Sequence, residues 1–223
     1  MKKLYLPLIF CLLVLGAGAQ QDPVYRFTKS WYRSNPFISS YGAFVEHVLQ
    51  DPDLINQRKQ LRTDSTLFVF NATFASYNPF SFKPSRVDVA LVEQNAQLYE
   101  DRPEGDTIML YVLMAFADST PRGADRLKKE YDRITRKSDR MFSDYKQEAI
   151  DQGKVTGVSR NYFVDYAQMA PVTIEFVTGL APTPILRITV RIRSRGNEAV
   201  LPMSLYDTKP QEIVDSGFKW FND

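Results

Sequence analysis

The first clear hydrophobic periodicity in the chain is a helical one, just after residue 40. Apolar side chains recur there at intervals of three and four residues, the spacing of one helix face. Ser39 or Ser40 supplies an N-cap, and Asp51-Pro52 has the form of a second helix start, so two short helices are predicted within 40–61. The apolar positions are Tyr41, Phe44, Val45, Val48 and Leu49.

Most of the remaining chain has the composition of β-strands. Segments rich in β-branched and aromatic residues alternate with Gly, Pro, Asn and Asp, which predicts strands separated by turns. Short connections at 94–95, 101–105 and 179–183 favour antiparallel neighbours. Residues 22–38 mix aromatic and turn residues and are predicted to form an extended arm or an irregular first strand. The predicted strands cover about 66–74, 86–93, 96–100, 107–116, 156–166, 171–178 and 184–194.

A charged segment at 121–151 is predicted to be one long amphipathic helix that ends before Gly153. The fold class that follows is α+β. We expect a largely antiparallel sheet of about six or seven strands, with this long helix packed on one face and the short helices near the N-terminus. The apolar stripe assigned to the helix is Leu127, Tyr131, Ile134, Met141, Phe142, Tyr145 and Ala149.

The N-terminus has the anatomy of a secretory signal peptide at residues 1–19. Two lysines precede an apolar run, and Ala17 and Ala19 supply the small residues of a cleavage site before Gln20. The expected mature chain, 20–223, is a single α+β domain exported to the periplasm or the extracellular space. Its apolar runs are too short for a transmembrane helix.

Charge and composition remove several classes of function. The net charge of +2 is too small to predict nucleic acid as a partner. One histidine, His47, and a single cysteine, Cys11 in the signal segment, leave no metal site or Ser/Cys triad, and scattered glycines offer no phosphate loop, so no cofactor is expected. Paired carboxylates remain open as hydrolytic groups. The acidic residues in or beside strands are Glu93, Glu100, Asp106, Asp165 and Glu175.

One strand stands out from this background, Leu186 to Arg195, because apolar and basic residues alternate along it. Side chains of a strand point alternately to its two faces, so the basic residues share one face. They form either a solvated face or an anion-binding face, and Glu175 on the preceding strand could offset one charge. The candidate binding residues are Arg187, Arg191, Arg193 and Arg195.

These observations favour an exported, non-enzymatic protein that binds a partner macromolecule, through this basic strand face if it has a functional surface. An anionic glycan, a lipid headgroup or an acidic protein surface would suit arginine. Two alternatives remain: a secreted hydrolase with paired carboxylates, and a carrier of a small apolar ligand. Two buried carboxylates in one cleft would favour the hydrolase, and a large apolar cavity would favour the carrier.

Overall fold

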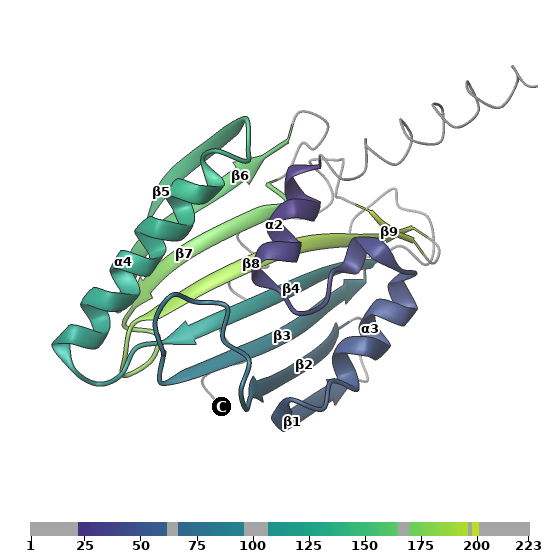
Figure 1. Ribbon diagram of the computed structural model, residues 1–223, viewed down its shortest axis with the longest axis horizontal. Helices are drawn as coiled ribbons and strands as arrows, with labels where there is room; N and C mark the ends of the chain where they lie inside the picture. The colour runs from purple at the N-terminus through teal and green to yellow at the C-terminus, as the bar shows by residue number, and fades with distance from the viewer. Residues whose placement is uncertain (1–21, 62–66, 96–106, 165–169, 196–197, 201–223) are drawn as a thin grey trace, which may run out of the picture.

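The computed structural model describes residues 22–61, 67–95, 107–164, 170–195 and 198–200 (Figure 1). These residues form an antiparallel sheet with three α-helices on one face, so the fold is α+β as predicted. Eight strands follow one another across the sheet in the order β1-β2-β3-β4-β8-β7-β6-β5, and a short ninth strand pairs with β8. The sheet is therefore larger than the six or seven strands expected from the sequence.

The elements in chain order show where the prediction succeeded. The helices are α2 (Pro23–Trp31), the 3-10 turn η1 (Pro36–Ile38), α3 (Tyr41–Leu49) and α4 (Pro121–Ser138). The strands are β1 (Leu54–Leu61), β2 (Leu67–Phe74), β3 (Arg86–Asn95), β4 (Thr107–Phe116), β5 (Asp144–Gln152), β6 (Val155–Phe163), β7 (Val172–Thr178), β8 (Ile185–Arg195) and β9 (Glu198–Val200). Six predicted strands correspond to β2, β3, β4, β6, β7 and β8, and the predicted strand at 96–100 lies outside the described residues.

The sheet consists of two four-stranded meanders. Strands β1 to β4 pair in sequence, as do β5 to β8, and α4 connects the two halves. The last strands of the halves, β4 and β8, pair antiparallel over ten residues, from Thr107 opposite Ser194 to Phe116 opposite Ile185. The seam between the halves therefore runs through the middle of the sheet (Figure 1).

The main core lies between this sheet and the helices. In β8 the predicted alternation is confirmed, because Leu186, Ile188, Val190 and Ile192 are fully buried in the cluster that also contains the helices' apolar residues. Burial of apolar area at about 25 cal/mol per Å² is the main force that holds the helices on the sheet. The helix residues in this core include Val24, Phe27, Trp31, Phe44, Val48, Leu127, Tyr131 and Ile134.

The opposite face of the sheet carries a second buried cluster, centred on β3 and β4. Alternate residues such as Ala90, Leu110 and Val112 belong to it, while their neighbours belong to the main core. Both faces of β4 are therefore buried. This explains why its sequence is almost continuously apolar rather than alternating.

The region predicted as an extended arm is instead a helix, α2. The side chain of Asp22 accepts hydrogen bonds from the backbone N–H groups of Val24 (2.8 Å) and Tyr25 (3.1 Å), and Pro23 occupies the first turn. This is the same Asp-Pro start signal that was recognised at 51–52. The buried positions Val24, Phe27, Thr28 and Trp31 have helical spacing, which the aromatic content of the segment obscured.

At 51–52, by contrast, the start signal does not lead into a helix. The predicted second helix is β1, an edge strand that pairs with β2. Asp51 accepts a hydrogen bond from the N–H of Asp53 (2.9 Å), which turns the chain instead of capping a helix. The register shifts between Ile55 and Arg58, where Asn56 has a φ of 53°, a conformation that asparagine tolerates. Only the first predicted helix, now α3 with Ser40 as its N-cap, is confirmed.

The long helix is also shorter than predicted. It ends at Ser138, and residues 144–152 form β5, which pairs with β6. Gly153, assigned to a helix end, has a φ of +69° in the two-residue turn between these strands, the conformation that such hairpin turns require. Ile134 faces the sheet, whereas Tyr145 lies on β5 and is 44% exposed.

Candidate functional site

The alternation in β8 places Arg187 and Arg191 on the face of the sheet opposite the helices. Both side chains are buried: Arg187 is 6% exposed and Arg191 is 4% exposed. Arg193 and Arg195 belong to β8 by their backbone, but their side chains lie outside the description. The two described arginines therefore do not form an exposed row, although they do share a face.

Arg187 has an acidic partner across the strand pair. It lies opposite Glu175 of β7, and its Nε is 2.5 Å from a Glu175 carboxylate oxygen. Both side chains are less than a tenth exposed, so the pair is desolvated. The offset of one arginine by Glu175, expected from the sequence, is confirmed. A buried charge needs such a partner because desolvating it alone is costly.

Arg191 is the unusual member of the row. One of its terminal nitrogens, Nη1, donates to the carbonyl oxygen of Ala170 and to the hydroxyl of Thr173, both at 2.8 Å. Its Nε has no hydrogen-bond partner, and no described carboxylate lies within ion-pair distance. Burial lowers the pKa of Arg191 to about 10, against the opposing effect of the more distant Glu175. The guanidinium is thus a buried cation with one unused donor.

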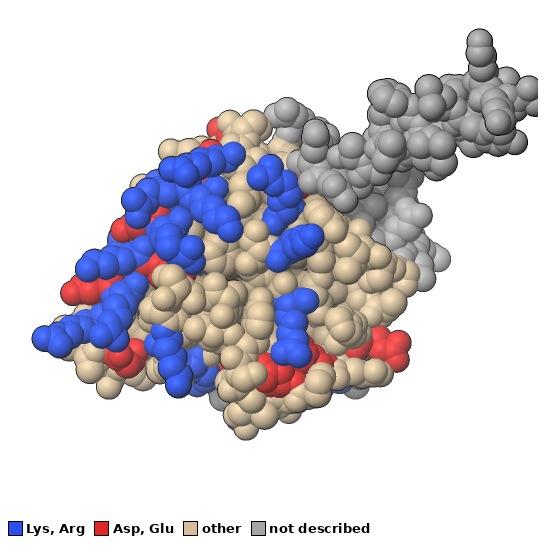
Figure 2. Space-filling model, in the orientation of Figure 1, with Lys and Arg blue, Asp and Glu red and all other residues tan. Residues whose placement is uncertain are grey.

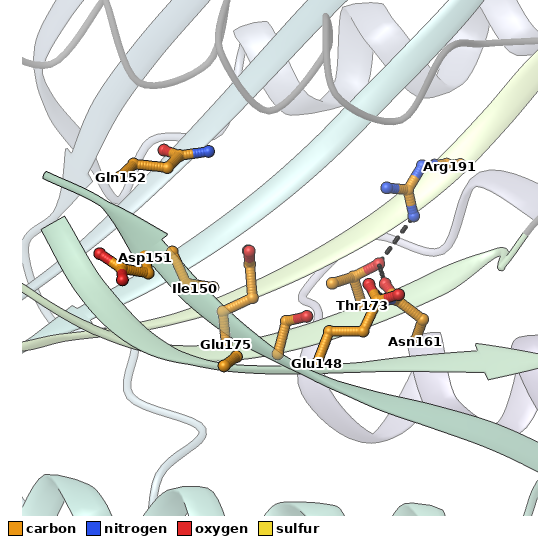
Figure 3. A pocket seen from close by; sticks show the side chains of 10 residues that line it. Glu148, Ile150, Asp151, Gln152, Asn161, Thr173, Glu175 and Arg191 are labelled. Atoms are coloured by element: carbon orange, nitrogen blue, oxygen red, sulfur yellow. Dashed lines mark hydrogen bonds between the residues drawn. The ribbon is translucent and has the colours of Figure 1, made fainter.

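A chain of hydrogen bonds leads from Arg191 across the sheet to its edge (Figure 3). Thr173 of β7 receives the bond from Arg191 and donates to the amide oxygen of Asn161 on β6, at 2.9 Å. Asn161 in turn donates to the carboxylate of Glu148 on β5, at 3.1 Å. Glu148 is 46% exposed and also pairs with Lys146 at 2.6 Å. Four neighbouring strands thus contribute to one polar network.

This network lines a pocket with a volume of about 190 Å³, which extends over β5, β6, β7 and β8 (Figure 3). Arg191 stands on one side of it, and residues 148–152 of the edge strand β5 line the other, with the carboxylate of Glu148 on the same face as Arg191. Hydroxyl and amide groups of Ser159, Thr173 and Asn161 lie between them. The lining is therefore polar and carries both signs of charge.

The carboxylates of the described residues do not meet the requirement set for a hydrolase. Of the acidic candidates that lie within the described residues, Glu175 lines the pocket, and it is paired with Arg187. Glu93 accepts a hydrogen bond from the hydroxyl of Tyr41 on α3, at 2.8 Å. Glu148, which sequence reasoning did not single out, lines the pocket but is exposed, and the side chain of Asp151 lies on the other face of β5. The remaining candidates, Glu100, Asp106 and Asp165, lie outside the described residues.

Nor does this pocket suit an apolar ligand. Its walls carry carboxylate, amide, hydroxyl and guanidinium groups, whereas a carrier of an apolar molecule needs a mainly hydrophobic cavity. In the parts of the chain that the structure describes, no three His, Cys, Asp or Glu side chains are grouped to hold a metal ion. No described helix combines the length and apolar character needed to cross a membrane.

The helical side of the molecule shows a feature that sequence reasoning missed. Figure 2 shows Lys and Arg side chains spread over α4 and α2, with acidic residues mainly towards the margins. We call the exposed members the basic helical face, and none of them forms an ion pair with a carboxylate of the described chain. Its residues are Arg26 and Lys29 of α2, with Arg126, Lys129, Arg136 and Lys137 of α4.

Two cationic side chains connect the helices within this face. Arg133 and Lys137 of α4 lie over the ring of Trp31 of α2, with the guanidinium carbon 5.1 Å and the ammonium nitrogen 5.0 Å from the ring centre. Such cation–π contacts favour a close approach of positive charge to an aromatic face. Arg133 is also neutralised by Glu130, which is buried beneath it. The contact therefore holds the two helices together and keeps the basic residues on one surface.

A signal for this face was present in the sequence. Residues 121–140 contain eight Lys and Arg against four Asp and Glu, a local net charge of 8 − 4 = +4 that exceeds the +2 of the whole chain. Two of the acids are used in pairs with partly buried arginines, Glu130 with Arg133 and Asp139 with Arg160. Because the predicted helix extended over 121–151, the acidic residues of β5 were counted as part of it, and the excess of positive charge on the true helix was not recognised.

Comparison with models of protein families, with curated proteins and with solved structures finds no match for this chain.

Proposed function

We propose that this protein is an exported, non-enzymatic binding protein that holds an anionic partner macromolecule on its basic helical face. The observation that carries the proposal is the set of six exposed basic side chains on α2 and α4 without carboxylate partners in the described chain. The class of function is the one expected from the sequence. The proposed binding surface differs from the one expected from the sequence, because it lies on helices α2 and α4 and not on strand β8.

The size of the basic helical face supports a large partner. Helix α4 has 18 residues, and at about 1.5 Å per residue it is roughly 27 Å long. Its basic side chains are distributed along most of that length, and α2 adds two more beside it (Figure 2). An extended array of cations matches an extended anionic surface better than a small ion.

The burial of Arg187 and Arg191 in β8 supports the same choice. Arg187 and Arg191 are 6% and 4% exposed, so a macromolecule could not reach them without rearrangement of the sheet. The cations on α2 and α4 are accessible to solvent. Exposed charges attract a partner over about 10 Å at 0.1 M salt, so binding through this face depends on ionic strength.

The test uses the mature chain and a double charge reversal, Lys129→Glu with Arg136→Glu. Its matched control is Arg58→Glu with Lys59→Glu, which reverses two exposed charges on the edge strand β1. Binding is measured to vesicles containing an anionic phospholipid, to an immobilised acidic polysaccharide and to an acidic protein. Each basic residue near a charged surface contributes about 1 kcal/mol, so the helical reversal should weaken binding at least tenfold.

The three probes also distinguish the classes of partner. The probe that the protein binds most tightly at physiological salt, whether lipid, polysaccharide or protein, indicates the class of its natural partner. The control variant should bind like the original protein, and added salt should weaken binding to every probe. Equal binding by the helical variant and the control would refute the proposed surface. A lower melting temperature of the helical variant would show that the loss of binding reflects unfolding, so thermal melts accompany each assay.

A further inference from the structure

We infer that the outer edge of β5 is a self-association surface, at which β5 pairs antiparallel with β5 of a second copy of this chain. The two strands are centred on Gln147, so that the two sheets join into one continuous sheet. This surface lies on a strand that is not part of the basic helical face. The inference therefore does not depend on the function proposed for the helices.

Strand β5 is an open and regular edge. It is the last strand in the order of the sheet and pairs on one side only, with β6. The register of that pair is unbroken from Asp144 opposite Phe163 to Gln152 opposite Val155. Eight of the nine residues of β5 are exposed. An edge of this kind presents a row of unpaired backbone groups, which is a template for another strand.

The opposite edge of the sheet, β1, is different. Its register with β2 shifts between Ile55 and Arg58, and Asn56 has a φ of 53°. A bulge that disrupts the edge is one of the devices by which proteins prevent strand pairing between molecules. Strand β5 has no such shift and contains neither proline nor glycine. Of the two edges, β5 is therefore the one suited to a partner strand.

The hairpin between β5 and β6 fixes which backbone groups point outward. The two-residue turn makes Gln152 and its partner in β6 a hydrogen-bonded pair, and such pairs alternate with non-hydrogen-bonded ones along the strand. The N–H and C=O groups of the odd-numbered residues in 145–151 therefore point away from β6. Pairing centred on Gln147 places Tyr145 opposite Ala149 of the second copy, and Gln147 opposite itself. All of these odd-numbered residues then form hydrogen-bonded pairs across the new seam.

The charges of β5 complement each other in this register. Lys146 and Glu148 point to the face of the sheet opposite the helices and are 69% and 46% exposed. Lys146 of each copy lies opposite Glu148 of the other, in a non-hydrogen-bonded pair, where side chains are close. Opposite charges in such cross-strand pairs are stabilising, and like charges are destabilising. Centring the strands on Glu148 instead would place two carboxylates opposite each other, so the charges select the register.

The arrangement also determines how the two molecules face. Odd-numbered residues pair with odd-numbered ones, so the helices of both copies lie on the same side of the joined sheet. The two basic helical faces would then be presented to one extended partner, and two linked sites bind more tightly than one. This last consequence rests on the proposed function, whereas the pairing of the strands does not.

The first experiment measures self-association of the mature chain by sedimentation velocity. A single strand pair makes an interface below the standard size, so we expect a monomer–dimer equilibrium with a dissociation constant on the order of micromolar to hundreds of micromolar. Lys146→Glu or Glu148→Lys alone introduces two like-charge pairs and should weaken the dimer about tenfold or more. An equimolar mixture of these two variants should restore it, because opposite charges meet again. Lys59→Glu, an exposed reversal on β1, is the matched control and should dimerise normally.

A second experiment tests the register by cross-linking. The chain from Gln20 onward contains no cysteine of its own. Gln147→Cys places one thiol of each copy at the centre, where paired Cα atoms are about 5.5 Å apart, within the range of a disulfide. Mild oxidation should therefore produce a covalent dimer. Asp151→Cys, on the same face, is the control and should stay monomeric, because eight residues of about 3.4 Å separate the two thiols.

Several outcomes would overturn the inference. A chain that stays monomeric over the whole concentration range has no such surface, and a dimer weakened by Lys59→Glu but not by the β5 variants forms at the other edge. Failure of the mixed variants to associate, or a disulfide at residue 151 but not at 147, would refute the register. None of these measurements includes an anionic partner, so they leave the basic helical face untested. Loss of anion binding in the helical variant with the dimer intact would affect only the proposed function.

Discussion

At the scale of single residues, two neighbouring arginines of one strand show how different the same side chain can be. Arg187 and Arg191 share a face of β8, and both are buried. Arg187 lies opposite an acid in the strand register, whereas Arg191 lies opposite Leu110 and interacts with a hydroxyl and a backbone carbonyl. The first arginine is part of a neutral pair, and the second keeps an unused donor beside a pocket.

The pair of Arg187 and Glu175 leads to a prediction about stability. Glu175→Gln leaves Arg187 buried without its counter-charge, and breaking a buried pair in this way costs about 3 to 5 kcal/mol. The free energy of unfolding, measured in urea, should therefore fall by that amount. Asp132→Asn breaks the exposed pair with Lys128, which is 2.6 Å long, and should cost no more than about 0.5 kcal/mol. Similar losses for both variants would contradict the special role assigned to burial.

At the scale of elements, the predictions were correct for segments whose own sequence pattern indicates the structure. Strands β4 and β8 and helix α3 have unambiguous patterns: a long apolar run, a strict alternation and a capped helical stripe. Segments that contain helix-forming residues but lie in the sheet were misassigned. In β1 and β5, Gln, Lys, Arg and Glu are frequent, and pairing with β2 and β6 decides the structure. Intrinsic propensity is weaker than a full ladder of hydrogen bonds to a neighbouring strand.

Helix α4 provides the prediction for this scale. Ile134 is fully buried in the main core, whereas Lys129 is exposed on the basic helical face. Ile134→Ala removes buried carbon atoms and leaves a cavity, which costs about 2 to 5 kcal/mol. Lys129→Ala removes no buried area and should change the free energy of unfolding by less than about 0.5 kcal/mol. A small effect of both changes in urea unfolding would mean that α4 does not pack on the sheet in solution.

At the scale of the whole molecule, tyrosine hydroxyl groups join helices to the sheet. Tyr32, directly after α2, donates to backbone carbonyls of Tyr111 (3.0 Å) and Ile188 (2.8 Å), one on each side of the seam between the two halves. Tyr77 donates to the carbonyl of Trp31 at the end of α2, and Tyr162 to that of Thr135 near the end of α4. The last carbonyls of a helix need such partners, because the helix itself provides none.

Because several tyrosines are buried, the free energy of unfolding should fall at alkaline pH. Burial raises the pKa of Tyr77 and Tyr131 to about 12 and moves the pKa values of Tyr32, Tyr111 and Tyr162 above their ordinary value. From about pH 10, phenols ionise in the unfolded chain while those in the folded chain keep their protons. The unfolded chain then binds fewer protons, so the free energy of unfolding falls as pH rises.

The expected slope can be measured directly. Each phenol that is ionised only in the unfolded chain lowers the free energy of unfolding by about 1.4 kcal/mol per pH unit. Urea unfolding at a series of pH values from neutral to about 11 should show a stable plateau and then a steady loss. Tyr162→Phe removes one of these phenols and should make the loss less steep. A free energy of unfolding that stays constant above pH 10 would contradict the burial of these side chains.

The sequence by itself determined the fold class, the capped helix α3, six of the strands and the two-faced character of β8, because each of these depends on spacing within one short segment. Only the tertiary structure decided that 54–61 and 144–152 are strands and that Arg187 and Arg191 of β8 are buried. Strand partners and burial depend on residues far apart in the chain. For the same reason, the pocket at Arg191 and the basic helical face emerge only when β5 to β8 and α2 with α4 are brought side by side.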